Sequence, residues 1–193
     1  MSQNLEIEFK NMLSKDEYHM LLDFFDIPDE QVISQENHYF DTPSFHLKDK
    51  GAALRIRQKR GKFEMTLKQP YQDGLLETNQ NLSQEEAALA ILTGKLPSGT
   101  IKELISKMNI SFSEIEYFGS LVTKRAEIKY RDGLLVFDHS YYLNKEDFEL
   151  EYEVENYQQG KQIFFEFLDQ HNIPQRKTDN KIKRFYLQKL KEK

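Results

Sequence analysis

The chain contains no cysteine, so disulfide bonds and thiolate metal sites are excluded, and any bound metal must use oxygen or imidazole ligands. It also has no apolar run approaching the roughly 18 residues that a transmembrane helix needs. Residues 1–4 lead directly into patterned sequence, without the basic and then apolar segment of a secretory signal. We therefore expect a cytoplasmic protein that does not contact a membrane.

Excess positive charge is absent as well. The net charge of -5 argues against a general nucleic-acid binder. No glycine spacing fits a phosphate loop, no serine sits in a glycine-flanked elbow, and the histidines form no helical metal-ligand pair. A backbone nucleotide cradle, a serine or cysteine nucleophile and a zinc site are thus not expected. With no repeat or low-complexity linker, the sequence predicts one domain over residues 1–193.

What the chain does contain is alternation of apolar and polar residues, the pattern of strands with two different faces. Asp73-Gly74 and Asp132-Gly133 are turn signals that predict antiparallel hairpins. The expected strands cover residues 5–10, 36–41, 53–59, 63–68, 75–80, 124–130, 134–138 and 148–155.

Helical pattern lies between these strands. Ser14 with Glu17, and Ser83 with Glu86, have the spacing of a capping box at the start of a helix. Further helices are expected over 100–108, 158–171 and 180–191. About eight strands and five helices indicate an α+β protein with a sheet large enough to close.

Two of the expected strands have polar faces of one charge only. Residues 55, 57 and 59 are all basic, whereas residues 149, 151, 153 and 155 are all acidic. Alternate side chains on a strand lie about 7 Å apart, so a row of carboxylates repels itself unless cations are near. Such segregation needs a physical explanation.

A single alternating strand is more often half-buried, with its charged face in water. Acidic and basic strands in one chain favour a different interpretation, in which the charged faces point inward and helices cover the apolar faces. Mg²⁺ and Mn²⁺ prefer carboxylate and phosphate oxygens, and arginine binds phosphate through paired hydrogen bonds. We predict a closed eight-stranded antiparallel β-barrel with helices packed outside and an interior suited to a polyanion and divalent cations.

The order of these motifs resembles the CYTH family, also called triphosphate tunnel metalloenzymes, and is most similar to its small stand-alone bacterial members. The opening motif Glu6-Ile7-Glu8-Phe9-Lys10 alone would be weak evidence, but it is followed in order by further matching motifs over nearly the whole chain. These are Tyr39-Phe40-Asp41-Thr42-Pro43, Leu54-Arg55-Ile56-Arg57, Lys68, Arg125, Asp138, Glu149-Leu150-Glu151-Tyr152-Glu153, Lys181 and Arg184.

The resemblance implies an eight-stranded tunnel, two positions for Mg²⁺ or Mn²⁺, and a reaction on a triphosphate. Residue by residue, it implies metal binding by Glu6, Glu8, Asp138, Glu149, Glu151 and Glu153. Substrate binding is implied for Lys10, Arg55, Arg57, Lys68, Arg125, and Lys181 ahead of Arg184. The residues expected to take part in catalysis are Glu6, Glu8, Lys10 and Tyr39, although an aromatic at position 39 fits a structural role equally well.

The expected reaction is metal-dependent hydrolysis of tripolyphosphate or an organic triphosphate, so the expected partner is a small triphosphate. Two alternatives stay open: cyclisation of ATP to cyclic AMP, and a module that binds polyphosphate or a nucleotide without turnover. A homodimer is also left open, because the aromatic residues of 141–148 and 163–168 could bury area in one.

Overall fold

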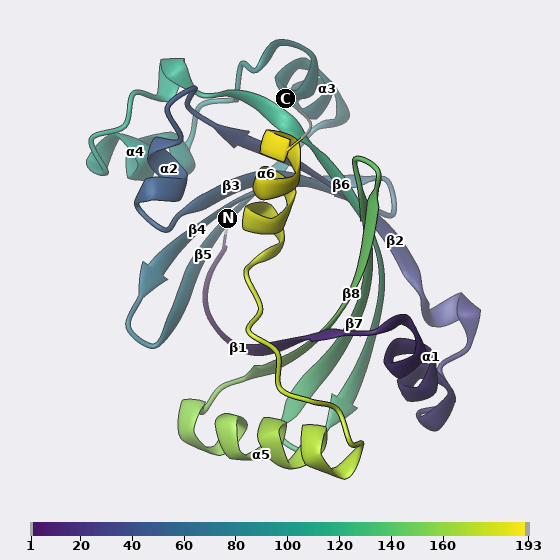
Figure 1. Ribbon diagram of the computed structural model, residues 1–193. Helices are drawn as coiled ribbons and strands as arrows, with labels where there is room; N and C mark the ends of the chain where they lie inside the picture. The colour runs from purple at the N-terminus through teal and green to yellow at the C-terminus, as the bar shows by residue number, and fades with distance from the viewer. Residues whose placement is uncertain (1, 192–193) are drawn as a thin grey trace. The chain divides into compact units, whose positions relative to one another are not determined.

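The computed structural model describes residues 2–191 and confirms the predicted barrel. Eight antiparallel strands close in the order β1-β5-β4-β3-β2-β6-β7-β8 (Figure 1). The strands are β1 (Ser2–Leu13), β2 (Ile33–Asp41), β3 (Ala53–Lys59), β4 (Lys62–Tyr71), β5 (Gly74–Leu82), β6 (Glu116–Tyr130), β7 (Gly133–Tyr142) and β8 (Lys145–Val154). The helices are α1 (Lys15–Phe24), α2 (His46–Asp49), α3 (Gln84–Thr93), α4 (Thr100–Lys107), α5 (Tyr157–Gln170) and α6 (Lys181–Lys191). No helix within 2–191 has the length and apolar composition needed to cross a bilayer.

The predicted capping boxes and hairpin turns are confirmed, whereas the lengths of some strands and one short helix differ from the prediction. Both capping boxes form, and both predicted hairpin turns join neighbouring strands. Strand β6 begins well before the expected residue 124, and the one-turn helix α2 was not predicted. A carboxylate explains α2: both oxygens of Asp41 accept hydrogen bonds from backbone N–H groups, among them those of Leu47 and Lys48. A helix this short has no apolar period to detect.

The contacts divide the chain into two compact units, each of which is described by itself. Unit 1 comprises Met1–Leu5 and Gln35–Ser120, and unit 2 comprises Glu6–Ser34 and Leu121–Lys193. The prediction of one domain over the full chain remains a prediction.

In unit 1, the apolar face of β3 and β4 is covered by α3 and α4. Leu54, Ile56, Met65 and Leu67 are fully buried in one cluster with apolar residues of the two helices. Because alternate residues of a strand point to opposite faces, this packing turns the charged residues of β3 and β4 away from the helices. The predicted assignment of the two faces is confirmed for this unit.

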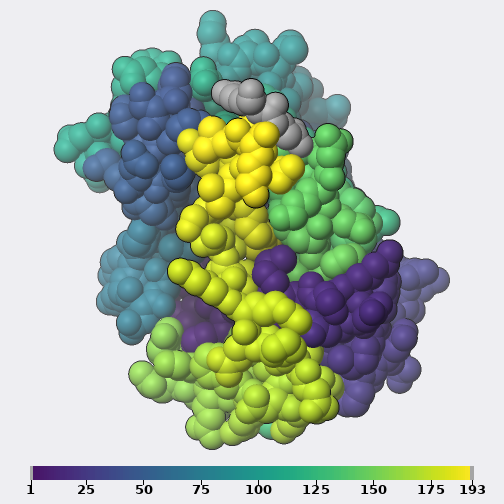
Figure 2. Space-filling view, in the orientation of Figure 1, coloured from purple at the N-terminus to yellow at the C-terminus, as the bar shows by residue number. Residues whose placement is uncertain are grey.

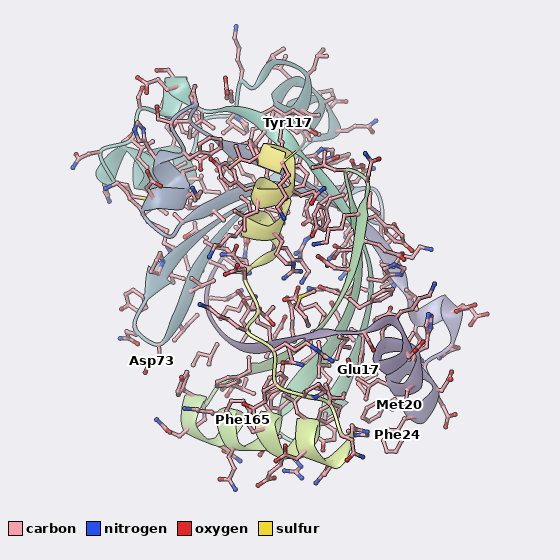
Figure 3. All side chains as sticks on the ribbon, in the orientation of Figure 1. Glu17, Met20, Phe24, Asp73, Tyr117 and Phe165 are labelled. Atoms are coloured by element: carbon pink, nitrogen blue, oxygen red, sulfur yellow. The ribbon has the colours of Figure 1, made fainter. Side chains whose placement is uncertain are left out.

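Unit 2 repeats the arrangement with β7, β8, α1 and α5. Figure 1 shows α5 lying along one face of these strands, where its Phe164 and Phe167 join Phe137, Leu150 and Tyr152 in a buried cluster. Phe164 and Phe167 of α5 therefore pack on their own sheet, and the homodimer stays a prediction. Phe165, labelled in Figure 3, packs partly buried against the same cluster.

The C-terminal segment of unit 2 is tied to β1 and α1 before it forms α6. Arg176 donates two hydrogen bonds to the carboxylate of Glu17, at 2.8 and 2.9 Å, and Asn11 accepts from the Arg176 backbone N–H at 2.6 Å. Farther on, Phe185 of α6 is buried and its ring contacts that of Tyr142. In Figure 2 this segment runs as a continuous ridge beside the β7–β8 hairpin. These contacts fix α6 against the polar side of β7 and β8.

Gly160 of α5 should not tolerate a larger side chain. A Cβ at this position would lie 2.5 Å from Cγ2 of Val154 and 3.1 Å from Phe9. We expect Gly160→Ala to lower the free energy of unfolding by about 1–2 kcal/mol, because overpacking outweighs the better helix propensity of alanine. Chemical denaturation measures this, with Lys161→Ala on the exposed side of α5 as the control. Equal or greater stability of the Gly160 variant would contradict the close packing.

The Glu17–Arg176 pair should make stability depend on pH. The hydrogen bond from Arg176 holds the pKa of Glu17 below its usual value. A carboxylate with a lowered folded-state pKa stabilises the protein above its unfolded-state pKa and loses this effect as pH falls through the folded-state value. Glu17→Gln keeps the capping acceptor but removes the charge, so we expect a loss of up to about 1 kcal/mol at pH 7 that shrinks below about pH 5.

Denaturation at several pH values tests this expectation. Glu86→Gln is the matched control, since Glu86 occupies the same capping position on α3 without an arginine partner within residues 2–191. A pH-independent loss in the Glu17 variant would show that the ion pair is not its cause.

Candidate functional site

The polar face of unit 1 is basic, as the sequence predicts. Arg55 and Arg57 alternate along β3, and Lys68 lies on the neighbouring strand β4. The side chain of Arg57 donates to Oδ1 of Asn37 at 3.0 Å, and Lys68 Nζ lies 2.6 Å from Oε1 of Glu77. The unit thus brings together three of the seven cations that the resemblance assigns to substrate binding.

Tyr39 also belongs to this polar face. It pairs with Arg55 across β2 and β3, whereas its neighbour Phe40 points into the apolar cluster. On the same face, Thr66 donates to Asn79 at 2.8 Å. Tyr39 is only 4% exposed, and its catalytic role stays a prediction.

The polar face of unit 2 is acidic and is formed by adjacent strands. Register places Glu8 opposite Glu153 and Lys10 opposite Glu151 across β1 and β8. Across β7 and β8, Asp138 pairs with Glu149. The structure therefore gathers the predicted acidic residues of this unit on one face, with Glu6 next in alternation along β1.

Two buried cations compensate the centre of this face. Arg125 on β6 binds both oxygens of Asp138 at 2.7 and 2.6 Å, and Glu151 at 2.7 Å. Lys181 Nζ lies 2.7 Å from Asp138, 3.0 Å from Glu149 and 2.6 Å from Glu151. One lysine therefore contacts three carboxylates that two strands present.

Arg184, one turn farther along α6, also reaches the acidic face. Its guanidinium binds Asp147 at 3.0 Å and contacts Glu149. Lys10 approaches from β1, with its Nζ 2.6 Å from Glu8. The sequence favoured Lys181 over Arg184 as the C-terminal residue of the site, and in the structure both side chains lie on this face.

The pKa shifts follow this arrangement. Although burial alone would lower it, Asp138, Glu149 and Glu151 hold the pKa of Lys181 well above its ordinary value. The pKa of Glu151 lies well below its usual range, because Lys181 and Arg125 outweigh the effect of burial. Burial raises the pKa of Glu149, and burial with nearby carboxylates raises that of Glu153 to about 7. Nearby cations therefore neutralise the charge of Glu151 at the centre of the face, whereas they offset the burial of Glu149 and Glu153 only in part.

The chemistry of this donor set, though not its present arrangement, suits a divalent cation. Carboxylate oxygens are the ligands that Mg²⁺ and Mn²⁺ prefer, and Oε1 of Glu149 is buried with no hydrogen-bond partner among residues 2–191. Within the same residues, no three His, Asp or Glu side chains already have the arrangement of a metal site. Several of the oxygens are bound instead by Arg125, Lys181 and Arg184, so a metal that used them would have to compete with these cations.

Among the acidic residues of these faces that sequence reasoning did not assign are Glu77 and Asp147. Glu77 lies opposite Lys68 in the β4–β5 hairpin, and Asp147 holds Arg184 while accepting from the Tyr142 hydroxyl at 2.6 Å. The hairpin turn at Asp73 contained the signal for Glu77, because a tight turn fixes which residues face each other. For Asp147 no such signal exists, since its partner lies on a distant helix.

Lys181 should be more important for stability than its position near the C-terminus suggests. Lys181→Met leaves Asp138, Glu149 and Glu151 buried with less compensation, and we expect a loss of about 3 kcal/mol or more at pH 7. Lys183→Met is the matched control, because Lys183 is about half exposed and, within residues 2–191, pairs with Asp179 alone, on its own segment. Denaturation at low ionic strength measures both variants. Similar losses in the two would contradict a compensating role for Lys181.

Comparisons with known proteins identify the family of this chain. The CYTH domain family matches residues 4–186. A protein of Bacillus subtilis named "Putative triphosphatase YjbK" is 50% identical over 192 residues, which cover 99% of both chains. The crystal structure of a "putative adenylate cyclase" from Bacillus halodurans superposes with a TM-score of 0.93 at 42% identity, over 96% of this chain and 100% of that one.

A third structure, named "Putative adenylyl cyclase HpAC1 from Hippeastrum" and described with a dominant triphosphatase activity, has a TM-score of 0.76 at 20% identity, over 94% of both chains. At that identity the likeness concerns the fold alone. The family match, in contrast, spans both units and nearly every residue of the two charged faces. This chain therefore belongs to the CYTH domain family.

Proposed function

We propose that this protein is a divalent-metal-dependent hydrolase of triphosphate substrates. The observation that carries the proposal is the sorting of charge by strand face: β3 and β4 present Arg55, Arg57 and Lys68, and β7 and β8 present buried carboxylates. The relationship to the triphosphatase-named protein of Bacillus subtilis supports the same reaction class. Neither face resembles a solvated protein surface, because most of these side chains are largely buried.

The basic face supplies the groups that bind a polyanion. Arginine presents a planar set of donors that matches two phosphate oxygens, whereas lysine acts as a compact point charge. Arg57 is oriented by its hydrogen bond to Asn37, which restricts the guanidinium before any ligand arrives. Such preorganised positive charge stabilises the negative charge that develops on phosphoryl oxygens during hydrolysis.

The acidic face supplies the metal ligands. We assign Glu6, Glu8 and Glu153 as the residues that would hold Mg²⁺ or Mn²⁺. Asp138, Glu149 and Glu151 would add ligands if Lys181 and Arg125 released some of the carboxylate oxygens that they now bind. When bound, such an ion neutralises phosphate charge and lowers the pKa of a coordinated water. Lys10, 2.6 Å from Glu8, orients that carboxylate and supplies a further positive charge.

Cyclisation of ATP is the second candidate, favoured by the name of the 42%-identical structure from Bacillus halodurans. It uses the same charges but replaces water with a ribose hydroxyl as the attacking group. We further infer a cytoplasmic location from the lack of cysteine. A homodimer is a separate proposal, which size-exclusion chromatography with light scattering tests.

One assay separates these functions. Purified protein is incubated with tripolyphosphate, ATP or thiamine triphosphate in the presence of Mg²⁺ or Mn²⁺, and both phosphate and cyclic AMP are measured. Metal-dependent phosphate release supports hydrolysis, and cyclic AMP from ATP would support cyclisation. Tight binding without either product would instead show a binding module.

Glu8→Gln and Arg57→Ala should each reduce kcat by on the order of 100-fold, since each removes a charge that acts on the phosphoryl group or its metal. Controls for the two variants are Glu155→Gln, which lies past the end of β8, and Lys62→Ala, at the exposed start of β4. Full activity of both the Glu8 and the Arg57 variants would contradict the assignment of the two faces to metal and phosphate binding.

A further inference from the structure

Glu77 is a carboxylate within the basic face of unit 1. The β4–β5 hairpin, whose tip is labelled at Asp73 in Figure 3, places it directly opposite Lys68. Its Oε1 lies 2.6 Å from Nζ of Lys68 and 3.8 Å from the guanidinium of Arg55. One acidic side chain therefore contacts two of the three cations of unit 1 that are assigned to substrate binding.

The surroundings keep Glu77 charged. Burial alone would raise the pKa of Glu77, but Lys68, Arg55 and Arg57 together hold it below its usual value. The side chain is 16% exposed, so its charge is only partly screened by water. At neutral pH it thus acts as a fixed negative charge among cations.

We propose that Glu77 is a positioning residue that holds Lys68 and Arg55 when no substrate is bound and weakens the binding of short phosphate products to this face. The inference rests on the proposed triphosphatase function. It concerns release of the product rather than the chemical step.

The physical reason is competition between anions. A phosphate oxygen that binds Lys68 comes close to the carboxylate of Glu77, which shares the same ammonium and repels the phosphate, so part of the attraction between ligand and face is offset. A triphosphate compensates for the repulsion by Glu77 through further contacts with the face, whereas the shorter pyrophosphate makes fewer such contacts. Tight binding of the product would slow its release and thereby slow turnover.

A plain structural role makes a different prediction. Oppositely charged residues facing each other on neighbouring strands stabilise a sheet modestly, whatever the face later binds. In that case, removing the charge of Glu77 would lower stability and leave the affinity for phosphates unchanged or reduced.

Ligand binding without metal distinguishes the two roles. Tripolyphosphate and pyrophosphate are titrated into the full chain in EDTA by calorimetry, so that the readout does not depend on turnover. We expect Glu77→Gln, which keeps an acceptor for Lys68, to bind pyrophosphate on the order of tenfold more tightly than wild type. Tripolyphosphate binding should tighten less, because that ligand makes contacts beyond Lys68.

Three further variants sharpen the test. Glu77→Thr is a second neutral variant suited to a strand, and it decides the question if the glutamine variant does not fold. Glu77→Asp keeps the charge and should stay within about threefold of wild type. Glu85→Gln, at an exposed position of α3, changes the net charge equally without touching the face. Thermal unfolding establishes that each variant is folded.

The outcomes separate the two proposals. Wild type that binds neither phosphate, with or without Mg²⁺, would refute the proposed function and this inference together. Wild type that binds both, with neutral variants that bind pyrophosphate no more tightly, would overturn the role of Glu77 and leave the function standing. Tightening by Glu85→Gln of the same size would show a general charge effect and would also overturn it.

Discussion

The burial of like charges on neighbouring strands, and their compensation from other segments, is the interaction on which this structure depends. Carboxylates that alternate along β8 cannot be buried close together unless cations neutralise them, because desolvation and mutual repulsion both oppose ionisation. Arg125 from β6 and Lys181 from α6 provide that compensation. A peripheral helix is therefore part of the electrostatic core of unit 2.

The two units bury charges of opposite sign on the polar faces of antiparallel strands. Unit 1 buries cations and places Glu77 among them, while unit 2 buries carboxylates and places Lys10, Arg125, Lys181 and Arg184 among them. In each unit the residues of the less frequent charge reduce the attraction between the face and a ligand of that same charge sign. For a polyanion this lowers the affinity of the basic face, and for a divalent cation it lowers the affinity of the acidic one.

Much of the candidate site was predictable because it lies on alternating strands. Arg55, Arg57 and Lys68 share a face with Tyr39 through strand register alone, and both capping boxes marked their helices correctly. What could not be predicted depends on side chains that meet across long sequence separations. Helix α2 exists because Asp41 accepts its backbone N–H groups, a contact that no periodic pattern announces.

The sequence by itself determined the fold class and the sign of each strand face, because a period of two residues allows apolar side chains one face and charged side chains the other. Only the tertiary structure decided which charges compensate which, since Lys181 reaches Asp138 and Arg184 reaches Asp147 from a helix distant in sequence. The reason is physical: alternation is a local property of the backbone, whereas pairing energy depends on distances that folding sets.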